Sequence, residues 1–234
     1  MAEGKKPAKS VKLNPELVEK VDSLFEQMSV MEREQKLYET IWAKVPRYRE
    51  SSPGQRLVGK VVTAYPITAS QSLVYDLGCG SGKAALEFRQ RGAKVVAVDF
   101  VDNCLNPEVK AELLKGWLDF KQADLSNKLN FVSKDATFFF CTDVMEHLPN
   151  EEIVDKVLTN IAEAFDCPGF FNIATYEDGA SHWLKDVAPE YAEEKLHKTV
   201  EEAQWWLNKL SKYFTITLAE AGSLGLEVFV TKKG

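Results

Sequence analysis

The sequence LVYDLGCGSGK at residues 73–83 predicts a buried strand, a glycine-rich turn and the start of a helix. The first five residues suit a buried strand, and Gly78, Gly80 and Gly82 follow at alternate positions before the helix-compatible run KAALEFRQR. A strand, a glycine turn and a helix in this order let backbone N–H groups and a helix N-terminus approach a ligand closely. Glycine is needed because a Cβ would block both a positive-φ turn and the ligand.

Two phosphate-binding motifs do not fit this turn. A phosphate-binding loop of the Walker A type needs Ser or Thr after its lysine, whereas Ala84 follows Lys83. The dinucleotide fingerprint G-x-G-x-x-G needs glycine where the chain has Lys83. The turn instead reads D-x-G-x-G-x-G from Asp76, so a pyrophosphate is not obviously provided for.

The rest of the chain alternates between strand and helix patterns. We expect strands at residues 73–77, 94–99, 119–123, 137–141, 170–174, 214–219 and 227–231, and helices near 83–91, 107–116, 151–165 and 199–212. Such alternation predicts a mostly parallel sheet with helices on both faces. The turn at residues 222–225 is too short for a crossover, so the last two strands must pair antiparallel. The predicted fold is α/β and Rossmann-like, with seven strands and an antiparallel last strand.

The N-terminal part of the chain is predicted to be separate from this sheet. We expect a flexible basic tail at residues 1–12, a helical cover and a ligand-facing loop at 13–70, and the main domain at 71–234. Ser29 and Glu32 predict a capping box, and Pro46 ends the helix that it opens. The apolar stripes of these N-terminal helices either cover the main domain or form the interface of a homodimer.

Composition narrows the class of protein. The 234 residues carry a net charge of −6, which disfavours nucleic acid as a partner. The four cysteines are scattered without a C-x-x-C pair, so neither a zinc site nor a disulfide framework is expected. No apolar run is long enough for a membrane span, and the N-terminus lacks the apolar stretch of a signal peptide. We therefore expect a cytoplasmic protein.

Four segments resemble, in order, the motifs of class I S-adenosylmethionine-dependent methyltransferases. DLGCGSG at residues 76–82 resembles motif I, and VVAVD at 95–99 resembles the second strand with its terminal acid. QADL at residues 122–125 is similar to the third-strand element, and FFCTDVMEHLP at 139–149 resembles motif IV. The resemblance covers the chain from about residue 47 onward and implies the class I fold and S-adenosyl-L-methionine as cofactor.

The resemblance also implies roles for individual residues. Asp99 would accept hydrogen bonds from the ribose hydroxyls, Phe100 would lie against the adenine, and Asp124 would accept from the adenine amino group. Arg49, with Tyr48 or Arg47, would bind the methionine carboxylate. The predicted cofactor-binding residues are Tyr48, Arg49, Asp76, Gly78, Cys79, Gly80, Gly82, Asp99, Phe100, Asp124, Leu125 and Thr142.

The residues themselves support this placement. Asp76, Asp99, Asp124 and Asp143 each come at or just past the end of a predicted parallel strand. Ligands of open α/β sheets bind at this edge, where a rim of carboxylates suits a positively charged sulfonium and an adenosine rich in donors. A cap on the following turn is the structural alternative for Asp76.

Three residues are candidates for catalysis. Methyl transfer requires an aligned acceptor and, for a neutral oxygen or nitrogen, a base that removes a proton. His147 follows the fourth main-domain strand, His197 lies in a predicted lid at residues 176–198, and Asp143 precedes His147 at the strand end. Each histidine also has a structural interpretation: His147 can bond the motif IV turn, and His197 stands just before Thr199, a plausible helix N-cap.

A metal site is a further alternative for the motif IV segment. Asp143-x-x-Glu146-His147 resembles the metal ligands of some O-methyltransferases, but the same pattern is widespread in methyltransferases without metal. We therefore predict no metal ligand.

The leading functional prediction is methyl transfer to a small-molecule acceptor at a hydroxyl, such as that of a sugar or a similar metabolite. One alternative is a nucleic-acid or nucleotide methyltransferase that uses the basic tail as an arm. The other is a regulatory subunit that binds S-adenosylmethionine without catalysis.

Overall fold

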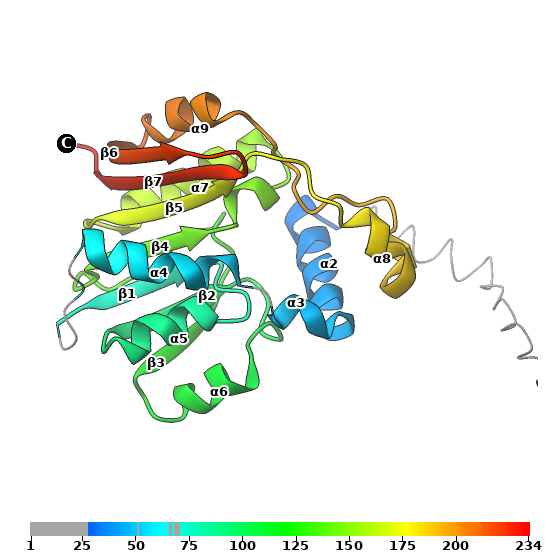
Figure 1. The fold of residues 1–234 in the computed structure, drawn as a ribbon, viewed down its shortest axis with the longest axis horizontal. Helices are drawn as coiled ribbons and strands as arrows, with labels where there is room; N and C mark the ends of the chain where they lie inside the picture. Colours follow the sequence, from blue (N-terminus) through cyan, green and yellow to red (C-terminus); the bar gives the residue numbers. More distant parts are fainter. Residues whose placement is uncertain (1–27, 51, 66, 68–70) are drawn as a thin grey trace, which may run out of the picture.

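A computed structural model describes residues 28–50, 52–65, 67 and 71–234 of the chain. Its seven strands form one sheet in the order β3-β2-β1-β4-β5-β7-β6 (Figure 1). They are β1 (Leu73–Leu77), β2 (Lys94–Asp99), β3 (Leu118–Gln122), β4 (Phe138–Thr142), β5 (Gly169–Ala174), β6 (Phe214–Ala221) and β7 (Gly225–Lys232). β1 pairs in parallel with β2 and β4, and β7 is antiparallel to both β5 and β6. The predicted fold class is confirmed.

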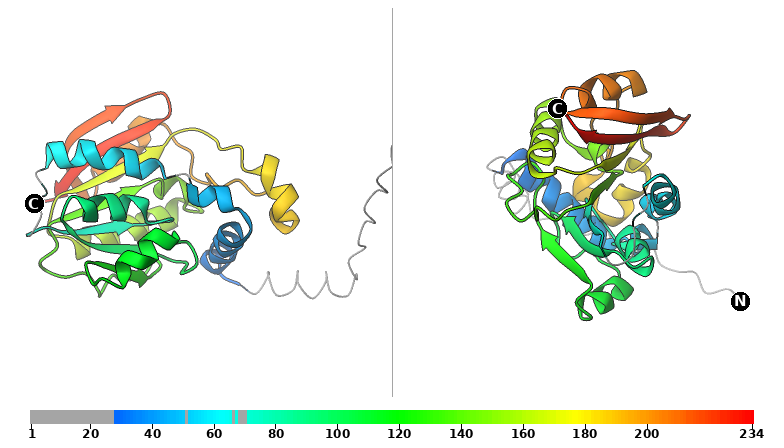
Figure 2. Two further views of the ribbon diagram at one scale, coloured as in Figure 1. Left: turned by 60° about the horizontal axis from the view of Figure 1, so that its bottom comes forward. Right: turned by 90° about the vertical axis from the view of Figure 1, so that its left-hand side faces the viewer.

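Helices cover both faces of this sheet (Figures 1 and 2). The helices are α2 (Val30–Lys44), α3 (Pro46–Glu50), α4 (Pro53–Ala64), α5 (Lys83–Gln90), α6 (Pro107–Leu113), α7 (Glu151–Ala164), α8 (Ser181–Val187) and α9 (Ala203–Leu210), with 3-10 turns η1 (Met145–His147) and η2 (Pro189–Tyr191). Successive residues of β1 point to opposite faces of the sheet. Val74 packs on the face covered by α4, α5 and α6. Tyr75 and Leu77 pack on the face covered by α7 and α9. This burial on both faces explains the nearly continuous apolar strands.

A second, smaller apolar cluster lies beyond the carboxyl ends of the strands. We call α2, α8 and η2 the cap (Figure 1). Leu37 and Ile41 of α2 pack in this cluster with Leu184 of α8 and Tyr191 of η2. The capping box predicted at the start of α2 is present, with reciprocal bonds between Ser29 and Glu32. Part of the predicted N-terminal cover is thus a cap that shares its core with the predicted lid.

The structure corrects two local predictions. The ligand-facing loop expected within residues 13–70 is largely helical after α2, because α3 begins at Pro46 and α4 begins at Pro53. Proline suits the first position of a helix, where its fixed φ is helical and its missing N–H is no loss. Thr199 is not the N-cap of α9, because Glu202 occupies that position and the Thr199 hydroxyl donates instead to the Leu148 carbonyl.

The other strand and helix boundaries differ from expectation by a few residues. β1 and β2 match in full, β3 starts one residue earlier, and β6 and β7 are longer than predicted. The predicted basic tail and the first N-terminal helix lie outside the described residues. No helix in residues 28–50, 52–65 or 71–234 is long and apolar enough to cross a membrane.

The first residue of β5 tests the packing between neighbouring strands. A Cβ on Gly169 would lie 2.1 Å from the ring of Phe139 on β4. We therefore expect Gly169→Ala to lower the free energy of unfolding by about 1–3 kcal/mol in urea titrations. Gly59→Ala in α4, where the nearest atom is 3.9 Å away, is the matched control and should be neutral or stabilising by up to about 1 kcal/mol. Equal effects of the two substitutions would contradict this packing.

Candidate functional site

Two adjoining cavities lie at the carboxyl ends of the strands, between the sheet and the cap. The β2 cavity, of about 140 Å³, is lined by the segment after β2, the segment after β3 and one face of α2. The β4 cavity, of about 420 Å³, is lined by the glycine turn, the end of β4 and residues of the lid. Trp42, Tyr48, Gly78, Gly80, Asp143 and His147 line both. The two cavities are therefore parts of one continuous site.

The three glycines of the turn adopt the positive φ angles that the sequence predicts. Gly78, Gly80 and Gly82 have φ values of 69°, 49° and 77°, in the region that favours glycine. A Cβ on Gly78 would lie 2.3 Å from Val144, and one on Gly80 would lie 3.2 Å from Trp42. Gly82 faces α6 and lines neither cavity, unlike the other two glycines.

Two buried oxygen atoms beneath this turn have no hydrogen-bond partner in the described part of the chain. The Oδ2 atom of Asp76 and the hydroxyl of Ser81 are buried without a hydrogen bond among the described residues, and both residues line the β4 cavity. Burial, with a smaller contribution from Asp99, raises the pKa of Asp76 to about 7. Native proteins rarely leave such groups unpaired, so this end of the site is built for a ligand with both donors and acceptors.

Asp99 ties the turn to β2. Its Oδ2 atom accepts from the Gly80 N–H at 2.9 Å, and its Oδ1 atom accepts from the Val101 N–H at 3.2 Å. Burial raises the pKa of Asp99 to about 6. Asp99 and Phe100 both line the β2 cavity, as do Asp124 and Leu125.

The structure does not place Arg49 for its predicted role. Its guanidinium donates to the carbonyls of Trp42, Asn103, Cys104 and Leu105 at 2.6–3.1 Å, and Arg49 lines neither cavity. Arg49 instead joins α2 to the segment between β2 and α6. The expected cation for a ligand carboxylate is therefore already used within the protein.

Asp124 is also engaged locally. Oδ1 accepts from the Ser126 N–H, and Oδ2 accepts from the Ser126 hydroxyl and from Asn127. This residue lines the β2 cavity, but both of its carboxylate oxygens accept hydrogen bonds from Ser126 and Asn127 in the turn that follows it.

Asp143 stands where the two cavities meet. It is the only non-glycine residue with positive φ in the described part of the chain, at 55°. Such a conformation is strained and persists only where surrounding structure imposes it, often at functional sites. Asn172 donates to its Oδ2 atom at 3.3 Å, and burial raises the pKa of its carboxyl group. Its neighbour Thr142 lines the β4 cavity.

His147 and His197 form a pair on the lid side of the site. Their rings lie 4.8 Å apart edge to face, and both line the β4 cavity. The Nδ1 atom of His147 lies 2.8 Å from the Leu196 carbonyl, and that of His197 lies 2.7 Å from the Tyr176 carbonyl. Because a carbonyl oxygen only accepts, the Nδ1 atom of each imidazole carries a proton and donates it to its carbonyl. The Tyr38 hydroxyl also lies 2.8 Å from Nδ1 of His147. Burial lowers the pKa of His147 to about 4, so this imidazole is neutral near pH 7.

Glu146 lies beside this pair, fully buried. Its Oε1 atom accepts from the Ala174 N–H at 2.9 Å, and its Oε2 atom has no partner among the described residues. Burial, together with the charge of Asp143, raises the pKa of Glu146 to about 8. The carboxyl group is therefore largely protonated at neutral pH.

Two clusters have atoms that could bind a metal. Glu146, His147 and His197 place ligand atoms within 4.8 Å of one another, as do Cys79, Asp99 and Cys104. Burial raises the pKa of the Cys79 thiol well above its usual range, which disfavours the thiolate that metals require. The absence of a metal ligand stays a prediction.

Sequence reasoning missed the site residues that α2 and the lid contribute. Glu34, Tyr38 and Trp42 of α2 line the β2 cavity, and Asp178 and Trp183 of the lid line the β4 cavity. The helical spacing of Tyr38 and Trp42 indicated a buried face but not what that face covers. His182 is exposed and lines neither cavity.

Comparison with known proteins places part of this chain in a methyltransferase family. Residues 74–167 match the family described as "Methyltransferase domain". A protein of Geobacillus sp. (strain WCH70) that carries the provisional name of methyltransferase is 31% identical over 91 residues. That match spans 38% of this chain and only 36% of the relative.

Solved methyltransferases share the fold at low sequence identity. Magnesium protoporphyrin IX methyltransferase of Synechocystis PCC 6803 has a TM-score of 0.57 and 17% identity, over 88% of this chain and 89% of that one. The 1,6-didemethyltoxoflavin-N1-methyltransferase of Burkholderia thailandensis has a TM-score of 0.57 and 18% identity, over 97% and 94%. N-methyltransferase NodS of Bradyrhizobium japonicum WM9 has a TM-score of 0.59 and 11% identity, over 86% and 99%. All three were solved with S-adenosylhomocysteine.

The protonated Glu146 gives a testable pH dependence. The folded protein holds this proton up to about pH 8, whereas the unfolded chain releases it near its usual pKa of 4.5. Between these values unfolding releases a proton, so this group lowers stability as the pH rises. Glu146→Gln should therefore make the slope of unfolding free energy against pH less negative by up to about 1.4 kcal/mol per pH unit, measured in urea between pH 5 and 8. The exposed Glu163→Gln serves as control, and an unchanged slope for Glu146→Gln would contradict the assignment.

Proposed function

We propose that this chain is an S-adenosylmethionine-dependent methyltransferase that methylates a hydroxyl group of a small molecule, because residues 74–167 match a methyltransferase domain and solved methyltransferases share the fold. The observation that carries the proposal is the arrangement of the β4 cavity. The Oδ2 atom of Asp76 and the Ser81 hydroxyl, without a partner in the described part of the chain, lie at its glycine-turn end. The neutral imidazole of His147 lies beside His197 on its lid side. A ligand bound between them would meet polar groups at one end and proton acceptors at the other.

The residues fit S-adenosylmethionine as the cofactor. The Oδ2 atom of Asp76 and the hydroxyl of Ser81, buried without a partner among the described residues, suit the ammonium and carboxylate of its methionine part. Gly80 leaves room where a side chain would meet Trp42, and Asp99 stands at the end of β2, where a ribose is recognised in folds of this kind. The β2 cavity, with Phe100 and Leu125 in its wall, would hold the adenine.

For methyl transfer the protein must mainly align the acceptor with the methyl group and remove one proton from the acceptor. When bound, the cofactor supplies a methyl group on a positively charged sulfur that leaves as a neutral thioether. Nε2 of His147 or His197 would take the proton of the acceptor hydroxyl as the acceptor oxygen bonds to the methyl carbon and the carbon–sulfur bond of the cofactor breaks. Asp143, held at the junction of the cavities, orients the acceptor.

The lining of the β4 cavity favours a small, uncharged acceptor. Trp42, Tyr48, Tyr176 and Trp183 supply flat apolar surfaces. Among the described residues that line either cavity there is no lysine or arginine, so an anionic acceptor finds no direct counter-charge there. This supports a sugar or similar hydroxylated metabolite over a nucleic acid, whose phosphates need basic contacts.

Cofactor binding is the first test. Calorimetric titration with S-adenosylhomocysteine should give binding that Gly78→Ala weakens by at least about tenfold, because the new Cβ would lie 2.3 Å from Val144 and distort the turn. Gly116→Ala also places alanine at positive φ, at 73°, but has nothing within 4 Å, and it should bind like the wild type. A wild-type protein that does not bind S-adenosylhomocysteine would refute the proposal.

The base is tested by methyl transfer itself. Release of S-adenosylhomocysteine should be followed against a panel of hydroxylated small molecules and, separately, RNA and DNA. Replacing both His147 and His197 by alanine should lower kcat by about 10²–10⁴-fold while calorimetry still detects cofactor binding. Unchanged turnover would show that neither histidine is the base. Binding without turnover on any acceptor would favour the regulatory-subunit alternative.

A further inference from the structure

We propose that Glu34 in the cap is a cofactor-binding residue, whose free Oε2 atom accepts a hydrogen bond from the exocyclic amino group of the adenine. The inference rests on the proposed function and adds a recognition element outside residues 74–167, the segment that matches the methyltransferase family. Glu34 belongs to α2 and lines the β2 cavity.

The hydrogen bonding of Glu34 is incomplete. Its side chain is 8% exposed, and its Oε1 atom accepts from Lys198 Nζ at 2.7 Å. Its Oε2 atom is buried without a partner among the described residues. A buried carboxylate oxygen left without a donor is costly, so a donor from a ligand in the adjoining cavity would remove a penalty as well as form a bond.

The position of Glu34 along α2 indicates that the adenine is the part of the cofactor nearest to it. Met31, Glu34, Tyr38 and Trp42 present one face of the helix to the β2 cavity. Trp42 lies over Gly80, next to the Asp99 carboxylate, and the Tyr38 ring is 5.5 Å from that of Phe100. Glu34 is one turn beyond Tyr38, about 6 Å further along the helix. A ribose at Asp99 and an adenine at Phe100 would therefore direct the far edge of the adenine, with its amino group, toward Glu34.

The residue expected to accept this amino group is engaged elsewhere. Both oxygens of Asp124 accept bonds within residues 124–127. Of these two carboxylates in the wall of the β2 cavity, Glu34 is the one with an oxygen that no described residue contacts by a hydrogen bond. The observations therefore favour the cap as the source of the adenine contact.

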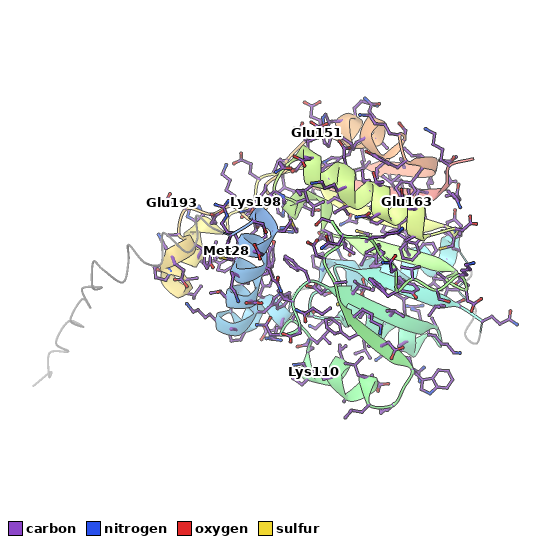
Figure 3. The ribbon with its side chains drawn as sticks, turned by 180° about the vertical axis from the view of Figure 1, so that it is seen from behind. Met28, Lys110, Glu151, Glu163, Glu193 and Lys198 are labelled. Carbon is purple, nitrogen blue, oxygen red and sulfur yellow. The ribbon has the colours of Figure 1, made fainter. Side chains whose placement is uncertain are left out.

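The ion pair of Glu34 links this contact to the catalytic pair. Lys198 directly follows His197, and it lies beside the start of α2, near Met28, in Figure 3. The backbone N–H groups of Lys198 and Thr199 donate to the Glu146 carbonyl at 2.8 and 3.0 Å. A carboxylate that holds the adenine would thus also hold Lys198, and with it the segment that carries His197.

A thermodynamic cycle that changes both Glu34 and the amino group of the ligand isolates the proposed hydrogen bond between them. Affinities are measured for S-adenosylhomocysteine and for its analogue with purine in place of adenine, which lacks the amino group. The wild type should prefer S-adenosylhomocysteine by roughly 10- to 100-fold, the range of a charge-assisted hydrogen bond. In Glu34→Gln this preference should fall at least fivefold. Glu194→Gln removes the other carboxylate bound to Lys198 and should keep the wild-type preference.

The outcomes separate this proposal from the proposed function. If Glu34→Gln keeps the wild-type preference, or weakens both ligands equally, Glu34 does not contact the amino group. If the wild type binds neither ligand, the proposed function itself fails. Should Glu34→Gln not fold, the double variant Glu34→Met/Lys198→Met, which buries no unpaired charge, replaces it in the cycle. An unchanged preference in that variant would equally overturn the proposal.

Discussion

The hydrogen bond from the Gly80 N–H to the Asp99 carboxylate is the contact on which the site depends. It joins the turn after β1 to the end of β2, and the Cys79 N–H reinforces it by donating to the Val98 carbonyl at 2.9 Å. With the turn fixed in this way, Asp76 and Ser81 stay buried beneath it and Trp42 closes over Gly80. Both cavities take their shape from this one junction between neighbouring strands.

Charge in the site is controlled by burial more than by ion pairs. Burial raises the pKa of Asp76, Asp99 and Glu146 to about 7, 6 and 8, and lowers that of His147 to about 4. Each shift favours the uncharged form of its group. A region with several acids and two imidazoles thereby stays compact without a lysine or arginine in its described lining. A positively charged ligand would reverse this balance for the acids by stabilising their ionised forms.

Local patterns predicted the sheet and the turn, whereas contacts between distant segments escaped prediction. The glycine turn, the strands and the capping box at Ser29 follow from residues close in sequence, and the structure has them within a few residues of where they were expected. Arg49 could not be placed in this way, because three of its four carbonyl partners are more than fifty residues away, in the segment before α6. The hydrogen bonding of Glu34 was equally hidden, because Lys198, which binds its Oε1 atom and not its Oε2 atom, lies 164 residues further along the chain. No pattern of spacing reports such pairings.

The separate apolar cluster of the cap has a consequence for how this protein can diversify. Leu37 and Leu184 pack within that cluster and share no core with the sheet. Substitutions on the cap side of the β4 cavity, such as at Trp183 or Ala180, can therefore reshape the acceptor end while the packing of the strands is untouched. The glycine turn has no such freedom, because Val144 and Trp42 crowd its glycines. One end of the site is thus open to evolutionary change, and the other is held constant by the architecture.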